Sequence, residues 1–177
     1  MAAPEASPRI EPLNALHDRK GFVCGKEALD QYFQRQVTQD ARRHLATPFV
    51  MVMPDGVIGG FYTLSSTALR LHDLPDDIAK RLPRYPLIPA TLIGRLAIDR
   101  GYHGQGWGSF LLLDALHRST GDDTRRRFES TTGLSSDLRA PAPGWLYFVQ
   151  GKRGPARLHS AMLKAGREQW LAGVFWN

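Results

Sequence analysis

Three glycines at alternate positions, Gly104, Gly106 and Gly108, separate an apolar stretch from the apolar pattern of a helix. Glycine lets the backbone approach a ligand closely and adopt φ angles that other residues resist. The helix that follows directs its unpaired first-turn N–H groups and the positive end of its dipole back toward these glycines. The stretch 91–118 therefore predicts a site that holds a phosphate group without a charged side chain.

Other nucleotide-binding loops share this order of strand, glycine loop and helix, and the sequence disagrees with two of them. A P-loop requires G-x-x-x-x-G-K-[ST], and the chain contains no Gly-Lys-Ser or Gly-Lys-Thr. A dinucleotide-binding loop requires G-x-G-x-x-G and an acidic residue on a second strand about 20 residues later. Here Ser109 stands where the third glycine belongs, and residues 119–130 show no strand pattern. A helix that merely begins at a glycine turn is the remaining alternative, and three alternate glycines disfavour it.

The segment 103–108, HGQGWG, resembles the R/Q-x-x-G-x-G/A loop of the GNAT family of N-acetyltransferases, with His103 at the first position. Three further stretches are similar to one subgroup of that family, the TacT-like acetyltransferase toxins of toxin–antitoxin pairs. They read HDRKGFVCGKEALDQYF (17–33), FYTLSSTALRL (61–71) and LPRYPLIPATLIGRLAIDR (82–100). The resemblance runs from about His17 to about Arg118, and residues 119–177 depart from it.

The resemblance implies that the chain binds acetyl-CoA, with no metal. In this family the loop amides hold the pyrophosphate, and the backbone of the preceding strand meets the thioester and the pantetheine arm. Carried over residue by residue, the cofactor-binding positions are Leu96, Ala97, Ile98, His103, Gly104, Gln105, Gly106, Trp107, Gly108 and Ser109. The amine attacks the thioester directly, so the protein must align both groups and supply a proton to the departing thiolate.

The resemblance also implies a function: acetylation of the amino group of aminoacyl-tRNA, which blocks translation. Such toxins are homodimers in the cytoplasm, and a ribbon-helix-helix antitoxin neutralises them. The expected tRNA-binding residues are Arg95, Arg42 and Arg43. Two alternatives stay open. One is a catalytically impaired or relic protein that keeps the fold and CoA binding, and the other is a GNAT enzyme acting on a small amine or a protein N-terminus.

The general acid of the resembled family is missing from its usual place. There, a helix with an A-x-x-F-Y-x-x-x-G-F motif supplies a Tyr that protonates the CoA thiolate, and this chain has no Phe-Tyr pair after residue 62. Residues 119–144 are polar and aperiodic. If they are an insertion, strands over 145–149 and 171–176 and a helix over 155–169 complete the fold, with Tyr147 or His159 as the acid. If instead the reading frame shifted near Arg118, the C-terminal part is incomplete; the abrupt change in composition favours this second explanation.

Composition sets wider limits. The 177 residues suit a single domain, 1–177, and 42% hydrophobic with 23% charged residues is typical of a soluble globular protein. No apolar run is long enough for a transmembrane helix, and we expect no membrane association. One cysteine, Cys24, suits a reducing cytoplasm. The net charge of +6 favours a polyanionic partner, although solubility alone explains it equally well.

The patterns along the chain predict the order of elements that a GNAT fold requires. We expect an α/β (α+β) fold with a mixed central sheet and helices on both faces. The predicted helices cover 26–37, 38–44 with Thr38 as its cap, 75–82 and the segment after the glycine loop. The predicted strands cover 49–53, 57–66 and 91–99, with a bulge or close contact at Gly59-Gly60 and an extended lip at 83–89.

Three residue types need a second interpretation. Arg95 lies among apolar residues, so it either pairs with an acid near Asp99 or faces the active-site cleft, and we favour the cleft. Cys24 follows no nucleophile pattern, which favours a structural role. The six histidines show no ligand spacing, so we expect no metal site.

Overall fold

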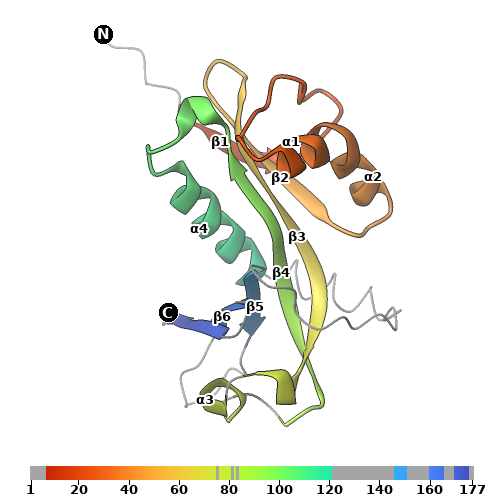
Figure 1. Ribbon diagram of the computed structural model, residues 1–177, viewed down its shortest axis with the longest axis vertical. Helices are drawn as coiled ribbons and strands as arrows, with labels where there is room; N and C mark the ends of the chain where they lie inside the picture. The colour runs from red at the N-terminus through yellow and green to blue at the C-terminus, as the bar shows by residue number, and fades with distance from the viewer. Residues whose placement is uncertain are drawn as a thin grey trace. The chain divides into compact units, whose positions relative to one another are not determined.

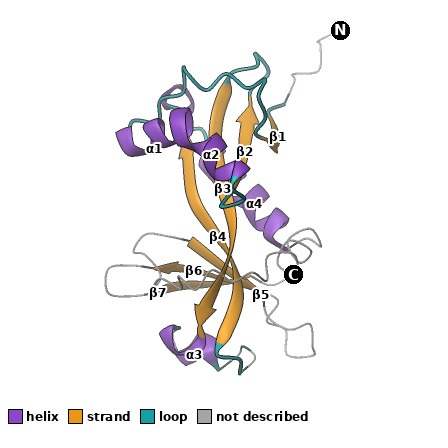
Figure 2. Cartoon of the chain, turned by 90° about the vertical axis from the view of Figure 1, so that its right-hand side faces the viewer, coloured by secondary structure: helices purple, strands orange, loops and turns teal. Residues whose placement is uncertain are grey.

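The computed structural model describes residues 7–74, 76–80, 82, 84–120, 146–150, 160–165 and 170–175. Figures 1 and 2 show its helices and strands. In chain order they are β1 (Arg9–Pro12), α1 (Glu27–Gln31), the π-helical turn η1 (Tyr32–Gln36), α2 (Val37–Arg42), β2 (Thr47–Val52), β3 (Ile58–Arg70), the 3₁₀ turn η2 (Leu71–Asp73), α3 (Asp76–Ala79), β4 (Leu87–Ile98), the 3₁₀ turn η3 (Arg100–Tyr102), α4 (Trp107–Thr120), β5 (Leu146–Gln150), β6 (Ser160–Ala165) and β7 (Trp170–Phe175).

The chain packs as two compact units, and the boundaries between them fall inside β3, β4 and α4. Among the described residues, unit 1 comprises 7–64 and 95–115, and unit 2 comprises the others. The strands form one sheet in the order of the chain, from β1 to β7. β1 with β2, β2 with β3, β4 with β5, β5 with β6 and β6 with β7 all pair antiparallel. A single domain over the whole chain stays a prediction.

Helices cover both faces of the strands in unit 1 (Figure 1). Side chains along β3 alternate between the two faces. Phe61 points to the face of η1, where its ring stacks on Phe33 with 4.1 Å between the ring centroids. Tyr62, the next residue, points to the opposite face and donates a hydrogen bond from its hydroxyl to Asp114 in α4. The expected placement of helices on both faces is therefore confirmed in this unit.

Each unit has its own apolar cluster. In unit 1 the buried members come from the segment before α1, from η1, from α2 and from β2, β3 and β4: Phe22, Cys24, Tyr32, Phe33, Val37, Val50, Val52, Ile58, Phe61 and Ala97. In unit 2 the buried members among the described residues are Leu69, Leu74, Leu82, Ile88 and Ala90. The glycine loop belongs to unit 1, so the cluster of unit 1 is the one that supports the candidate site.

Both expectations for Gly59 and Gly60 are confirmed. Met51 pairs with Gly60 while Val52 pairs with Ile58, so Gly59 is the extra residue of a β-bulge. At Gly60 the strand passes close to its neighbours. A Cβ there would lie 2.7 Å from Ile98 Cδ1 and 3.0 Å from the carbonyl oxygen of Ala97.

The elements nearest the candidate loop agree with the sequence predictions. The strand expected over 49–53 is β2, that over 57–66 is the first part of β3, and that over 91–99 lies within β4. The helix expected after the glycine loop is α4. The helix expected over 75–82 is the short α3, Asp76–Ala79. Apolar runs predicted the strands, and Pro75 at a first helical turn predicted the short helix.

The prediction of two separate N-terminal helices was wrong. Helical backbone runs from α1 through η1 into α2 without a break, so Thr38 lies inside α2 and caps nothing. A cap residue needs extended backbone, whereas Gln36, which precedes α2, has φ −106° and ψ −31°. Instead of a break, the chain widens into a π turn, which keeps Tyr32, Phe33 and Val37 buried together.

Two finer expectations also need correction. The last residues of the lip expected over 83–89 already belong to β4, which begins at Leu87. Proline tolerates this extended backbone. The pairing of β4 with β5 begins at Ala90. The apolar side chains of α4 are not all buried. Leu111 is fully buried, whereas Phe110 and Leu113 are 42% and 64% exposed.

The C-terminal third follows the expectation in two of three places. β5 and β7 match the strands expected over 145–149 and 171–176. The helix expected over 155–169 was wrong for 160–165, which form β6. β6 pairs with strands on both sides, which satisfies its backbone, and alanine or leucine recurs at every second position from 161 to 165, the period of a strand. The choice between an insertion and a frame shift stays a prediction.

Gly60→Ala should destabilise the protein by about 1–3 kcal/mol, because the new methyl group overlaps a backbone oxygen that cannot swing away. Gly21→Ala is the matched control. Nothing lies within 4 Å of a Cβ at Gly21, so its effect should stay within about 0.5 kcal/mol. Denaturant unfolding of the three proteins measures the difference. Equal stability of the two variants would contradict the close approach of β3, β4 and α4.

Candidate functional site

The glycine loop has the backbone conformation that a phosphate-binding loop needs. Gly104 and Gly106 have φ angles of +75° and +83°, which disfavour residues with a Cβ. Nothing lies within 4 Å of a Cβ built at either position, so the space beside the loop is open. The helical bonds of α4 begin with the bond from Phe110 N to Gly106 O, at 3.2 Å. The N–H groups of the first helical turn precede that bond and are available to an anion.

The loop side chains brace the loop itself. His103 Nε2 lies 2.8 Å from Ile98 O, so this nitrogen carries the proton and donates to the end of β4. Gln105 Nε2 donates to Gly101 O at 3.3 Å, and Trp107 Nε1 donates to Gln105 Oε1 at 3.2 Å. These bonds occupy the side chains and leave the backbone amides for a ligand. The positive φ angles of Gly104 and Gly106 agree with the glycine loop expected from the sequence, while the binding of a ligand there stays a prediction.

Asp99 holds the start of this loop in place. Its Oδ1 accepts from Gly101 N at 2.9 Å, and its Oδ2 accepts from Val23 N at 2.8 Å. Its own N–H donates to Gly59 O at 2.9 Å, and Arg100 N donates to Val23 O at 2.8 Å. One residue thus joins the end of β4 to the bulge of β3 and to the segment before α1. Sequence analysis did not single out this role, although the spacing Asp-x-Gly is typical of an aspartate that caps a turn.

The strand positions assigned to the thioester alternate between faces. Ala97 is buried in the cluster beside η1. Ile98 faces α4, since its side chain lies against the positions where Gly60 and Gly108 would carry a Cβ. Leu96, two residues earlier on the strand, shares the face of Ile98. As expected, these side chains are packing residues, and their backbone groups are what the cofactor assignment proposes.

Arg95 stacks on an aromatic ring. Its Cζ lies 3.6 Å from the centroid of the Tyr32 ring, the geometry of a cation–π contact. The alternative pairing with an acid near Asp99 is not what the structure shows, because both carboxylate oxygens of Asp99 accept backbone N–H groups. The sequence did not indicate Tyr32 as the partner of Arg95, because no local pattern links two residues 63 positions apart.

Two titratable groups of this region are perturbed by burial. Burial raises the pKa of Tyr32 to about 12, an effect that the Arg95 charge opposes and the Asp40 carboxylate reinforces. Burial also raises the pKa of the Cys24 thiol, with a further contribution from Asp30. A thiol that resists ionisation is a poor nucleophile, which agrees with the structural role expected for Cys24.

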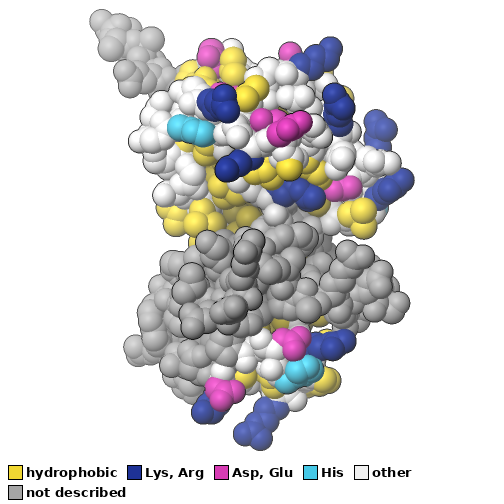
Figure 3. Space-filling model, in the orientation of Figure 1, with side chains coloured by type: hydrophobic (Ala, Val, Ile, Leu, Met, Phe, Trp, Pro, Cys, Tyr) yellow, Lys and Arg dark blue, Asp and Glu magenta, His cyan; other side chains and the backbone are white. Residues whose placement is uncertain are grey.

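The other predicted site residues lie in different places. Arg42 ends α2 and Arg43 follows it, and both are exposed. Lys and Arg side chains are scattered over the face of unit 1 in Figure 3, with Asp and Glu side chains between them. Tyr147 lies in β5 opposite Leu92 of β4. His159 lies outside the described residues.

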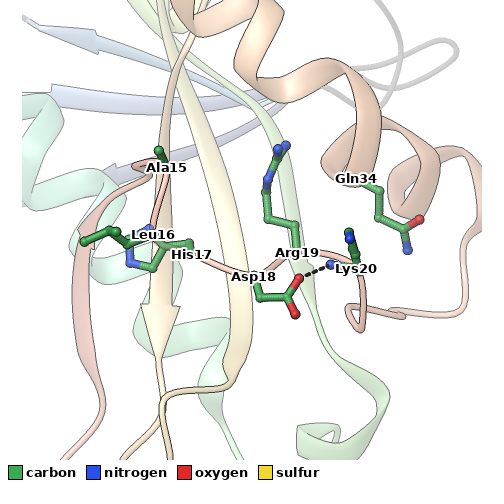
Figure 4. Close-up of a pocket in the computed structure, with 7 residues that line it drawn as sticks. All are labelled: Ala15, Leu16, His17, Asp18, Arg19, Lys20 and Gln34. Carbon is green, nitrogen blue, oxygen red and sulfur yellow. Dashed lines mark hydrogen bonds between the residues drawn. The ribbon is translucent and has the colours of Figure 1, made fainter.

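A surface hollow in unit 1 is separate from the glycine loop (Figure 4). It is lined by Ala15, Leu16, His17, Asp18, Arg19, Lys20 and Gln34. Its two cationic side chains come from one loop, and the Arg19 guanidinium already donates to Phe33 O at 2.9 Å. The hollow therefore adds nothing to the acetyl-CoA assignment.

The described residues contain neither a cluster of metal ligands nor a membrane-spanning helix. No three His, Cys, Asp or Glu side chains in this part of the chain come together as metal ligands would. None of its helices has the length and apolar character needed to cross a membrane.

In unit 1 a glycine loop joins β4 to α4 and helices cover both faces of the strands, the arrangement that the resemblance to GNAT acyltransferases predicts. No model of a protein family matches the chain. A probable TacT toxin of Sinorhizobium fredii is 35% identical over 124 residues, which cover 68% of each chain. A tRNA-acetylating toxin of Mycobacterium tuberculosis is 34% identical over 101 residues, 57% of this chain and 59% of that one. The chain belongs to the TacT family of acetyltransferase toxins.

Solved structures agree with this assignment. AtaT complexed with acetyl-methionyl-tRNAfMet is 31% identical, with a TM-score of 0.59 over 64% of this chain and 69% of AtaT. A tyrosine-to-phenylalanine mutant of KacT is 30% identical, with a TM-score of 0.61 over 67% and 72% of the two chains. AtaTR bound with acetyl-CoA is 28% identical, with a TM-score of 0.53 over 64% and 66%. These likenesses confirm the GNAT fold and the family resemblance inferred from the sequence.

Gly106→Glu should abolish acetyl-CoA binding, because it places bulk and negative charge where the pyrophosphate is expected. Any side chain at φ +83° strains the loop, so Gly106→Ala is the control that carries the strain without the charge. Titration calorimetry should find that the Ala variant keeps measurable affinity and the Glu variant has none. Unchanged affinity in the Glu variant would place the cofactor elsewhere.

Proposed function

We propose that this chain transfers the acetyl group of acetyl-CoA to the amino group of aminoacyl-tRNA and thereby blocks translation. The observation that carries the proposal is the open glycine loop at the N-terminus of α4, in a chain that belongs to the TacT family. One relative is named a tRNA-acetylating toxin, and the AtaT structure contains an acetylated methionyl-tRNA. The net charge of +6 supports a polyanionic substrate.

Each group of the site has a proposed role in this reaction. The backbone amides of 104–109 bind the pyrophosphate, and the backbone of Leu96, Ala97 and Ile98 aligns the pantetheine arm and the thioester. The amine of the aminoacyl group attacks the thioester carbon and a C–N bond forms as the C–S bond breaks. The nitrogen loses one proton, and the thiolate gains one. Arg95, Arg42 and Arg43 contact tRNA phosphates. The chain lacks the family motif whose Tyr protonates the thiolate, so Tyr147 and His159 are the candidate proton donors.

The proposal includes partners. Structures of relatives include a toxin–antitoxin pair bound to DNA, KacTA, which is 28% identical to this chain with a TM-score of 0.52. By analogy, we propose that a ribbon-helix-helix antitoxin neutralises this chain, that the chain acts as a homodimer, and that both proteins work in the cytoplasm. A short reading frame for a small DNA-binding protein immediately upstream would support this part of the proposal.

Incubation of the protein with radiolabelled acetyl-CoA and either charged or uncharged tRNA tests the reaction. We expect label on charged tRNA only, since the aminoacyl group adds a basic aliphatic amine, which is a far better nucleophile than the exocyclic amines of the bases. The Gly106→Glu variant is the control for transfer that does not depend on the loop. Label on uncharged tRNA, or only on small amines and peptides, would contradict the proposal.

Turnover should be far below that of a relative with the complete motif, because a missing proton donor typically costs about 10²–10⁴ in rate. Acetylation rates of Tyr147→Phe and His159→Ala, measured beside the unchanged chain, test this expectation. Full growth arrest on expression, unaffected by either change and abolished by Gly106→Glu, would show that another group supplies the proton.

A further inference from the structure

The contact between Arg95 and Tyr32 holds a positive charge at a defined place without neutralising it. The guanidinium lies 3.6 Å above the ring centroid, and Arg95 keeps part of its surface exposed. Among the described residues, the recorded ion pairs involve other cations, and none includes Arg95. Stacking leaves the N–H groups in the plane of the guanidinium, where they can donate to a ligand.

An ion pair would have had the opposite effect. A carboxylate partner binds a guanidinium in a bidentate manner, which occupies two N–H groups and cancels the charge. A ring face attracts the same cation and fixes its plane, and it competes for no hydrogen bond. The stacked arrangement therefore suits an arginine that must receive a phosphate.

Tyr32 is a rigid platform for this purpose. Only 3% of its surface is exposed, and its ring stacks on Phe61 with 6.5 Å between centroids. It begins the π turn η1, the one departure from α-helical backbone between Glu27 and Arg42. π turns of this kind occur frequently at functional sites, where the wider turn places one side chain differently.

The Tyr32 hydroxyl has a different environment from the ring face that contacts Arg95. It is buried and has no hydrogen-bond partner within the described part of the chain. The Asp40 carboxylate on α2 and the Arg95 guanidinium both act on it electrostatically. A buried hydroxyl without a partner is unfavourable compared with a phenylalanine of the same shape, so its effect must be separated from that of the ring.

We infer that Tyr32 is the positioning residue for Arg95 and that the stacked guanidinium binds a phosphate of the aminoacylated tRNA strand. This inference rests on the proposed function and adds to it the residue that orients the arginine. The ring, rather than the hydroxyl, provides the orientation. Arg95 touches the substrate, and Tyr32 acts only through Arg95.

Binding of charged tRNA to five proteins tests the inference: the unchanged chain, Tyr32→Leu, Tyr32→Phe, Arg95→Gln and the Tyr32→Leu/Arg95→Gln double variant. The affinity for charged tRNA is measured at several salt concentrations. Calorimetry measures the affinity for acetyl-CoA, and thermal unfolding shows whether each variant folds. Tyr32→Leu should weaken tRNA binding about threefold to tenfold and leave acetyl-CoA affinity unchanged. Tyr32→Phe should stay within about twofold of the unchanged chain, because it keeps the ring face.

Arg95→Gln should lower the slope of log affinity against log salt by about 0.7–0.9, the loss of one phosphate contact. When Arg95→Gln is already present, Tyr32→Leu should not weaken tRNA binding further, since the two residues act as one unit. If Tyr32→Leu does not fold, Arg95→Lys replaces it: lysine keeps the charge without the planar stack, and tRNA binding should weaken again.

Three results would overturn the inference. The first is normal tRNA binding by a folded Tyr32→Leu variant or, if that variant does not fold, by Arg95→Lys. The second is a Tyr32→Phe variant that binds tRNA as weakly as Tyr32→Leu, and the third is additive effects in the double variant. Each leaves the proposed function standing, because the unchanged chain still binds tRNA. An unchanged chain that binds no charged tRNA would overturn the proposed function, and this inference with it.

Discussion

The candidate site depends on one carboxylate more than on any other group. Asp99 accepts two backbone N–H groups, one from the 3₁₀ turn that leads into the glycine loop and one from Val23, 76 positions earlier in the chain. Its own N–H donates to the bulge residue Gly59. A carboxylate that accepts several backbone donors forms stronger hydrogen bonds than a neutral group would. The loop, the end of β4 and the segment before α1 therefore share one fixed point.

Close packing around Gly60 adds a second constraint. β3 approaches β4 and α4 so closely that a methyl group has no room at this position, and the aromatic cluster of Phe22, Phe33 and Phe61 fills the other face. The strand that carries the proposed thioester contacts is thus held from both sides. Rigid support of this kind is what a reaction between two separately bound groups requires, since small displacements misalign the amine and the thioester.

The sequence predicted these parts of the molecule unequally. Gly104 and Gly106 could be assigned because positive φ angles leave a signature in residue type. The strand before them and the helix after them could be assigned because burial leaves an apolar pattern. Thr38 misled because a polar residue between two apolar patterns looks like a cap, whereas the helical backbone continues through it as part of α2, directly after the π turn η1. Tyr32 and Val23 could not be linked to Arg95 and Asp99, because contacts between distant segments leave no local pattern. Residues 160–165 were misassigned because apolar residues in so short a stretch fit two periods.

The central claim is that the backbone amides of residues 104–109 bind acetyl-CoA. Amide hydrogen exchange, followed residue by residue with and without acetyl-CoA, tests it directly, because it reports the proposed N–H donors themselves. The account predicts slower exchange at these amides when acetyl-CoA is present, and no such slowing in the Gly106→Glu variant. Acetyl-CoA that binds the unchanged chain and protects amides elsewhere, while leaving 104–109 unaffected, would contradict it.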